Sequence, residues 1–281
     1  MPDAPAVPTV DLVDGTTIPQ LGFGTYLVDA GDAEQVVGQA LEAGYRHLDT
    51  AQGYHNETEV GRAIAASGIP RDELYVTSKL DNPHHHPDDV KRTFEESLER
   101  LGLDHLDLFL IHWPTPNAEV DYVDTWRAMT ELVADGRLRS AGVSNFQPDH
   151  LDRIVEATGV APAVNQIEAH PYFRNDTARE ASLRHGTAVE AWGPLGQGGA
   201  LLEEPVLAEI GERHGKSIAQ VALRWALQRG DIVFPKSSNP DRMRQNLEVF
   251  DFELSDEDLA SIAELDRGAD GRGGPHPDHF G

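Results

Sequence analysis

Short apolar runs alternate with longer segments of helical periodicity along most of the chain. In segment 32–44, for example, Val36, Val37, Ala40 and Leu41 recur at the spacing that places them on one face of a helix. We predict strands at 21–24, 45–50, 73–80, 106–112, 138–145, 163–168, 187–195 and 231–237. Each is followed by predicted helix, at 32–44, 57–66, 87–103, 121–135, 148–157, 176–185, within 203–229 as one or two helices, and at 240–247.

Eight strand–helix units is the count of a (β/α)8 TIM barrel. An open, doubly wound sheet has the same alternation and is the alternative architecture. The apolar run 108–111 is typical of a strand buried on both faces, and no linker interrupts the alternation. We therefore predict an α/β protein with a single barrel domain over residues 1–281.

The two ends of the chain lie outside the repeated units. Asp14 and Gly15 stand between alternating residues in segment 10–19, which predicts a tight β-hairpin. We expect this hairpin to cover the N-terminal end of the barrel. After a predicted helix at 255–264, segment 266–281 is rich in Gly and Pro, and we expect an ordered or semi-ordered tail over the barrel surface.

Composition narrows the class of protein. The chain of 281 residues is 39% hydrophobic and 25% charged, has no cysteine and carries a formal charge of −25. No apolar run approaches the roughly 18 residues of a membrane span, and no basic start with an apolar region indicates a signal peptide. The acidity argues against nucleic acid or an anionic membrane as a partner. We predict a cytoplasmic monomer that acts on a small molecule.

Polar residues follow the predicted strands where a barrel has its active site. Asp49, Lys79 and His112 lie at the ends of three consecutive strands, and Tyr54 lies in the loop after the first of them. Each residue alone fits an ordinary loop. Four groups able to act as acids or bases at successive strand ends favour a site.

These four residues make chemical sense together. A charged Lys79 beside Tyr54 would stabilise the phenolate and lower the pKa of the tyrosine, and Asp49 would hold the lysine in place. His112 could orient a carbonyl oxygen or share its proton. The result is a phenol able to protonate a developing alkoxide, as carbonyl reduction requires.

Two other motifs are weaker. Tyr75 and Lys79 form the Tyr-x-x-x-Lys pair that short-chain dehydrogenases use on a helix, but here the segment reads as a strand. Residues four apart on a strand are separated by about 13 Å. The triplet His84, His85 and His86 suggests a metal, yet adjacent histidines without other spaced ligands are more typical of a solvated turn, and we predict no metal site.

Carbonyl reduction without a metal or flavin suggests a nicotinamide cofactor. The segment 22–27 has only two glycines of a Rossmann fingerprint. Barrels commonly bind phosphate after strands seven and eight. The loop 192–199 is rich in glycine, and the basic segment 234–244 could hold the 2′-phosphate of NADP. Trp192 could stack on the nicotinamide, while Ser144, Asn145 and Gln166 could bind its carboxamide.

With these motifs in place, the chain resembles the aldo-keto reductases over nearly its whole length. The matching stretches are LGFGT, GYRHLDTA with Tyr54 after it, TSKL, LDLFLIHWP, GVSNF, VNQIEAHP, WGPLGQG and FPKS. It is most similar to bacterial 2,5-diketo-D-gluconate reductases. The resemblance implies an NADPH-dependent barrel enzyme whose catalytic tetrad is Asp49, Tyr54 as proton donor, Lys79 and His112.

The resemblance also implies binding residues. Those expected to contact NADPH are Thr25, Ser144, Asn145, Gln166, Trp192, Gly193, Pro194, Leu195, Gly196, Gln197, Gly198, Lys236, Ser237, Ser238, Arg242, Gln245 and Asn246. Those expected to contact substrate are Tyr26, Asp81, His112 and Trp113. Asp81 departs from this bacterial subgroup, which usually has tryptophan there, and would favour neutral or cationic carbonyls over anionic sugar acids. His55 and Gln245 are further departures.

Two functions remain open at this point. One is NADPH-dependent reduction of aldehydes or ketones. The other is a nicotinamide-binding regulatory subunit on the same fold. Retention of all four tetrad residues favours the enzyme modestly.

Overall fold

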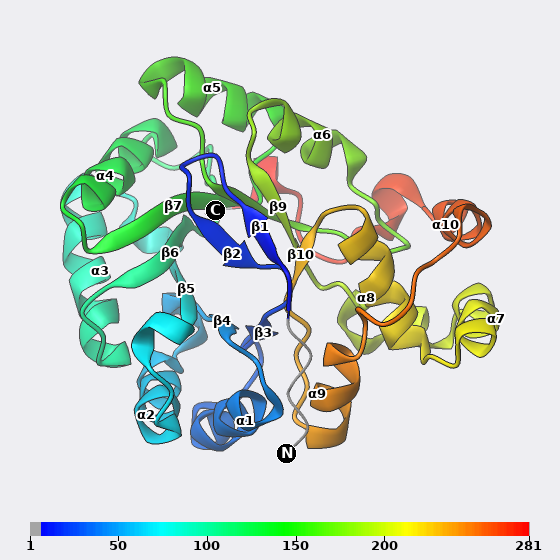
Figure 1. Cartoon of the computed structure of the whole chain (residues 1–281). Helices are drawn as coiled ribbons and strands as arrows, with labels where there is room; N and C mark the ends of the chain where they lie inside the picture. Colours follow the sequence, from blue (N-terminus) through cyan, green and yellow to red (C-terminus); the bar gives the residue numbers. More distant parts are fainter. Residues whose placement is uncertain (1–6, 281) are drawn as a thin grey trace.

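The computed structural model describes residues 7–280 and begins with a β-hairpin. Strands β1 (Thr9–Asp11) and β2 (Thr17–Pro19) pair antiparallel, as predicted. The Asp14 carboxylate closes the turn by accepting hydrogen bonds from the backbone and hydroxyl of Thr16. Ile18 packs with Tyr75 and other side chains of the barrel interior. The hairpin lies across the end of the barrel that faces the viewer in Figure 1.

The central sheet is parallel, and its strands follow one another in chain order. They are β3 (Phe23–Gly24), β4 (His47–Asp49), β5 (Tyr75–Leu80), β6 (Leu106–Ile111), β7 (Leu138–Ser144), β8 (Val164–Glu168), β9 (Ala188–Trp192) and β10 (Ile232–Val233). A bridge between Leu21 and Val233 joins the first strand region to the last. The Gly22 amide donates to the Val233 carbonyl, and the Val233 amide donates to the Gln20 carbonyl. These contacts close the sheet, which confirms the predicted (β/α)8 barrel.

Helices surround the barrel (Figure 1). They are α1 (Ala30–Ala43), α2 (Glu57–Ser67), α3 (Pro87–Leu101), α4 (Tyr122–Ala134), α5 (Pro148–Thr158), α6 (Asp176–Arg184), α7 (Pro205–His214), α8 (Ile218–Gln228), α9 (Pro240–Leu247) and α10 (Asp256–Ala263). Segment 203–229 forms two helices because Gly215, at φ 66°, ends α7 and the Ser217 side chain caps α8. No helix within residues 7–280 has both the length and the apolar character needed to cross a membrane.

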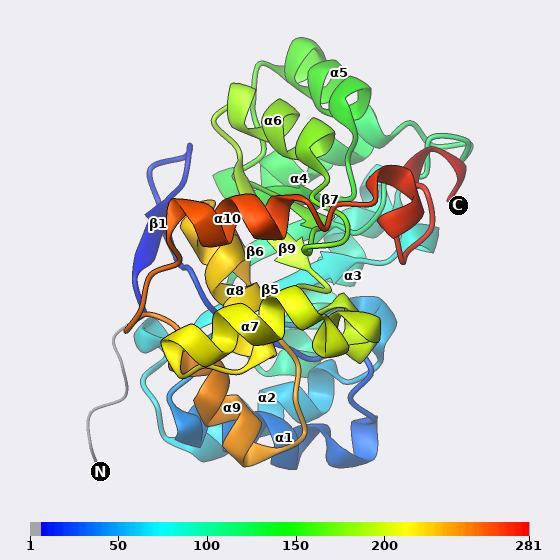
Figure 2. The same ribbon diagram turned by 90° about the vertical axis from the view of Figure 1, so that its right-hand side faces the viewer.

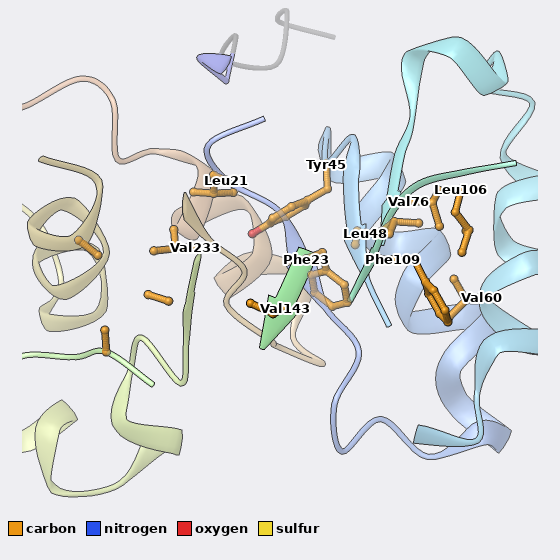
Figure 3. Close-up of a cluster of buried hydrophobic side chains, with 14 of the residues drawn as sticks. Leu21, Phe23, Tyr45, Leu48, Val60, Val76, Leu106, Phe109, Val143 and Val233 are labelled. Carbon is orange, nitrogen blue, oxygen red and sulfur yellow. The ribbon is translucent and has the colours of Figure 1, made fainter. Parts of the chain in front are cut away.

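Strand alternation sends side chains to two different places. Outward-facing residues pack against the helices, as where the Phe94 and Phe109 rings meet at 5.3 Å between centroids. Figure 3 shows part of this outer core, with Leu21 near Val233 where the barrel closes. Inward-facing positions include Asp49 and Lys79, so the same alternation that builds the core points these polar side chains into the barrel.

The tail is ordered, as predicted. After α10 it reaches the end of the molecule opposite the hairpin, where its last turn is drawn in red in Figure 2. The Glu168 carboxylate, at the end of β8, accepts hydrogen bonds from the backbone amides of Gly273 and Gly274 at 2.6 and 3.0 Å. The Phe280 ring lies 4.3 Å from that of Trp113, centroid to centroid. The tail therefore covers part of the face where the strands end.

Candidate active site

A buried lysine joins the predicted tetrad. Lys79 Nζ lies 2.6 Å from Asp49 Oδ1, donates to the Thr50 carbonyl at 2.9 Å and lies 3.2 Å from the Tyr54 hydroxyl. The Lys79 side chain is fully buried and that of Asp49 is 3% exposed. The parallel pairing of β4 with β5 brings Asp49 and Lys79 to the same end of the barrel. The structure thus places three of the four predicted residues in one hydrogen-bonded chain.

The electrostatics of Tyr54 differ from the sequence-based expectation. Burial raises the pKa of Tyr54, and the neighbouring Lys79 lowers it by less, so its pKa lies above the usual value. Lys79 acts in the expected direction, but the expected net lowering is wrong because burial outweighs the lysine. Burial also opposes the charge on Lys79, but Asp49 and Tyr54 raise the pKa of this lysine above its ordinary value. The pair is therefore a protonated phenol beside a charged ammonium.

His112, the fourth predicted residue, is a neutral imidazole beside Tyr54. Its ring lies 5.7 Å from the Tyr54 ring, centroid to centroid, in an edge-to-face arrangement. Burial, with a smaller effect of Lys79, lowers the pKa of His112 to about 3. A neutral ring retains one N–H donor, which suits it to hold a carbonyl oxygen beside the tyrosine.

The loop that carries Tyr54 is held by Asn56. Tyr54 ends the short 3₁₀ turn η1 (Gln52–Tyr54). The Asn56 amide donates to the Thr25 and Val28 carbonyls at 3.0 and 3.1 Å, and its oxygen accepts from the Thr50 hydroxyl at 2.9 Å. Thr25 is fully buried, and its hydroxyl also approaches the Asn56 oxygen at 3.5 Å. Asn56 therefore ties this loop to the segment that carries Thr25 and Val28.

Four predicted cofactor residues form one hydrogen-bonded cluster at the ends of β7, β8 and β9. The Trp192 indole donates to Asn145 Oδ1 at 2.8 Å, and Asn145 Nδ2 donates to Ser144 Oγ at 3.0 Å. The Ser144 hydroxyl donates to the Gln166 carbonyl at 2.9 Å. Asn145 Nδ2 also donates to the His112 carbonyl at 3.0 Å, which links this cluster to the tetrad.

Sequence reasoning missed Glu190 of β9. Gln166 Nε2 donates to Asp49 Oδ2 at 2.9 Å and to Glu190 Oε2 at 2.8 Å. Burial and the nearby Asp49 raise the pKa of Glu190 to about 8. An acid inside the apolar stretch AVEAW was the available signal, because a charged residue in a buried strand requires a polar partner.

The two predicted phosphate-binding segments, 192–199 and 234–244, differ in backbone conformation and in charge. In the loop after β9, Gly193, Gly196, Gln197 and Gly198 all have positive φ. After β10, Lys236 and Arg242 are exposed and form no ion pair with another described residue, whereas Arg244 pairs with Asp241 at 2.6 Å. The remaining predicted residues vary in exposure: Pro194 and Asn246 are buried, Leu195 and Ser237 are half-buried, and Ser238 and Gln245 are exposed.

The predicted substrate residues occupy two places. Tyr26 is 53% exposed, with its ring 5.2 Å from that of Tyr54, and Trp113 packs under the tail. Asp81 instead lies against the η1 turn, where an added Cβ on Gly53 would be 3.1 Å from Asp81 Oδ1. It contributes to a cavity of about 320 Å³ shared with His55.

The histidine triplet has structural contacts. His85 is buried, with Nδ1 3.2 Å from the Thr115 hydroxyl, and its carbonyl accepts from Thr125 at 2.8 Å. His86 caps α3 by accepting from the Asp88 amide at 3.3 Å. No cluster of three or more metal-ligating side chains occurs in the described part of the chain.

Comparison with known proteins decides the family. The profile of the Aldo/keto reductase family matches residues 20–267. The chain belongs to the aldo/keto reductase family. An aldo-keto reductase from Mycolicibacterium smegmatis (strain ATCC 700084 / mc(2)155) is 51% identical over 97% of this chain and 98% of its own. Methylglyoxal reductase DkgA from Yersinia pestis is 43% identical over 98% of each.

A solved structure supports the same assignment for this aldo/keto reductase. The crystal structure of a Gox0644 variant in complex with NADPH is similar with a TM-score of 0.93 and 42% identity, over 98% of this chain and 99% of that one. The relatives named here are reductases, and their names give no support to a regulatory subunit. The resemblance inferred from the motifs is confirmed.

Proposed function

We propose that this aldo/keto reductase reduces aldehydes or ketones to alcohols with NADPH. The observation that carries the proposal is the contact of the buried Lys79 with both Asp49 and Tyr54. When bound, the cofactor would supply the hydride for the carbonyl carbon. Tyr54 gives its proton to the carbonyl oxygen, and the products are an alcohol and NADP⁺.

Each of the other tetrad residues has one task in this proposal. Lys79 lies against the oxygen that becomes a phenolate, so its charge stabilises the tyrosine after the proton leaves. Asp49 holds Lys79 in that position. His112 is neutral and donates a hydrogen bond that orients the substrate oxygen near Tyr54.

The strand-end cluster fits the nicotinamide end of NADPH. Gln166 Oε1 accepts no hydrogen bond from a described residue, so it is free to accept one from the carboxamide NH₂. Ser144 now donates to the Gln166 carbonyl, and Asn145 donates to the His112 carbonyl and to Ser144. One of these bonds would be exchanged for one to the carboxamide oxygen. Trp192 would stack on the ring. The exposed Lys236 and Arg242 would meet the 2′-phosphate without first breaking an ion pair. The NADPH complex of Gox0644 supports NADPH as the cofactor.

We propose small neutral carbonyls as the substrate class. Tyr26 offers an aromatic wall beside Tyr54, Trp113 offers an aromatic surface that packs on the tail, and Asp81 adds negative charge near the loop that carries Tyr54. The chain also carries a formal charge of −25, which disfavours anionic substrates. The name of the Yersinia relative points to methylglyoxal, a small α-dicarbonyl compound, as one candidate.

The test follows NADPH oxidation with small aldehydes, α-dicarbonyls and 2,5-diketo-gluconate. Tyr54→Phe is expected to lower kcat/KM by about 100- to 10,000-fold, the usual range for a general acid. Binding of NADPH, measured by fluorescence quenching, serves as the control and is expected to persist. Activity that survives in Tyr54→Phe would refute the proton-donor role, and a wild-type protein that binds NADPH but reduces none of these carbonyls would refute the proposed reaction.

A further inference from the structure

Glu190 is a fully buried carboxyl group inside the barrel that the proposed reaction does not use. Its oxygen Oε2 accepts a hydrogen bond from Gln166 Nε2 at 2.8 Å, and the same nitrogen donates to Asp49 Oδ2 at 2.9 Å. A primary amide nitrogen carries two hydrogens, so both are taken. The amide of Gln166 is thus held between two carboxyl groups, one on each side.

This arrangement permits only one orientation of the amide. If the Gln166 side chain were flipped, its oxygen would face two carboxyl oxygens and both hydrogen bonds would be lost. With Nε2 held inside the barrel, Oε1 is the atom left for a ligand. Asp49 alone would occupy a single hydrogen, and Glu190 occupies the second.

We propose that Glu190 is a positioning residue that fixes the amide of Gln166 so that Oε1 accepts a hydrogen bond from the carboxamide NH₂ of the cofactor. The inference rests on the proposed function, in which Gln166 binds the carboxamide. Glu190 acts only through Gln166.

The role holds in either protonation state of Glu190. Oε1 of Glu190 is buried and has no hydrogen-bond partner among the described residues, so a proton can be carried there. Oε2 remains an acceptor for Gln166 whether or not that proton is present. The neighbouring groups that act on Glu190 are Asp49, Lys79 and Tyr75. If Glu190 is neutral, the Gln166 amide contacts one negative charge, that of Asp49, and the nearby Lys79 balances it.

The test compares NADP⁺ with its 3-acetylpyridine analogue, in which an acetyl group replaces the carboxamide and the NH₂ donor is absent. The ratio of the two Kd values reports how strongly Gln166 Oε1 accepts the hydrogen bond from the carboxamide NH₂. Wild type is expected to prefer NADP⁺. Glu190→Met has a similar length and no acceptor, so the preference should fall about fivefold, the worth of one hydrogen bond. Glu190→Gln still accepts through its oxygen and should retain most of it.

A surface acid provides the matched control. Glu156 is exposed on α5, and Glu156→Gln is expected to leave the Kd ratio at the wild-type value. Loss of stability alone would weaken both ligands together and leave the ratio unchanged. A Glu190→Met protein that folds and keeps the wild-type ratio would overturn the inference.

A second measurement needs no cofactor and no change at Glu190. In the ligand-free wild-type protein, NMR of the Gln166 side-chain amide, assigned through its loss in Gln166→Leu, should show both hydrogens protected from exchange with solvent. Protection of only one hydrogen would overturn the role of Glu190. A protein with both hydrogens protected that does not bind NADP⁺ would instead refute the proposed function, and the orientation of Gln166 would stand.

Discussion

The buried pair of Lys79 and Asp49 gives the sharpest prediction about stability. Lys79→Met keeps most of the side-chain volume and removes the charge. Among residues 7–280, it leaves the Asp49 carboxylate, 3% exposed, with only the Gln166 side-chain hydrogen bond, and it removes the Lys79 donor from the Thr50 carbonyl. Removing one partner of a buried ion pair typically costs about 3 to 5 kcal/mol. We expect the free energy of unfolding to fall by that amount.

Removing the second charge should restore stability. Asn at position 49 still accepts the hydrogen bond from Gln166, but it has no charge to leave unpaired. The double variant Asp49→Asn with Lys79→Met is therefore expected to be more stable than Lys79→Met alone by about 2 kcal/mol or more. Urea unfolding at pH 7.5, followed by circular dichroism, measures both differences.

An exposed ion pair supplies the control for this experiment. Lys91 lies 3.4 Å from Glu131, and its side chain is 51% exposed. Lys91→Met makes the same chemical change at a solvated site, where the cost is about 0 to 1 kcal/mol. The reasoning fails if Lys79→Met is no more costly than Lys91→Met, or if the double variant is less stable than the single one.

Further predictions concern packing and pH. Gly61→Ala would place a Cβ 2.3 Å from the Leu101 carbonyl oxygen and should cost about 2 kcal/mol. Gly38→Ala, whose Cβ would meet no described atom within 4 Å, should stabilise the protein by about 0.5 to 1 kcal/mol. Equal effects of the two changes in urea unfolding would be evidence against this packing. Gly274→Ala would place a Cβ 2.6 Å from the Trp192 ring, so the tail should be displaced and cut faster by proteases, and an unchanged cleavage rate would contradict the contact. Burial lowers the pKa of His47 and His85 to about 4 and that of His112 to about 3. These histidines take up protons only on unfolding near pH 5, which lowers the free energy of unfolding by about 4 kcal/mol for each pH unit of acidification there. Glu190, whose pKa burial raises to about 8, loses its proton on unfolding in the same range and offsets about 1 kcal/mol, so the expected net fall is about 3 kcal/mol. Urea unfolding at pH 5 and 6 measures this change, and a flat response would refute it.

The order of strands and helices could be predicted because each element carries its own local signals. Helix α3 begins at Pro87 and ends before Gly102, in the left-handed conformation, and both residues are visible in the sequence. The lengths of the strands could be predicted less accurately from the sequence. Segment 231–237 was predicted as a strand, but only Ile232–Val233 is paired, since pairing depends on neighbouring strands that lie far away in the chain.

The site could be predicted as far as the strand-end rule reaches. That rule brought Asp49, Lys79 and His112 together, but it could not tell how strongly burial raises the pKa of Tyr54. The contacts of Glu168 also could not be predicted from the sequence. They join residues more than a hundred positions apart through backbone amides, which have no sequence signature.

The bridge between Leu21 and Val233 has a consequence for how the protein is synthesised. The strand that completes the cylinder comes late, at residue 233 of 281. A nascent chain shorter than this can form only an open sheet with unpaired backbone groups along two edges, and such edges promote association between chains. Until most of the chain has left the ribosome, the sheet is therefore open at both edges. A chaperone in the cell, or rapid dilution during refolding, should limit association between chains most strongly at that stage.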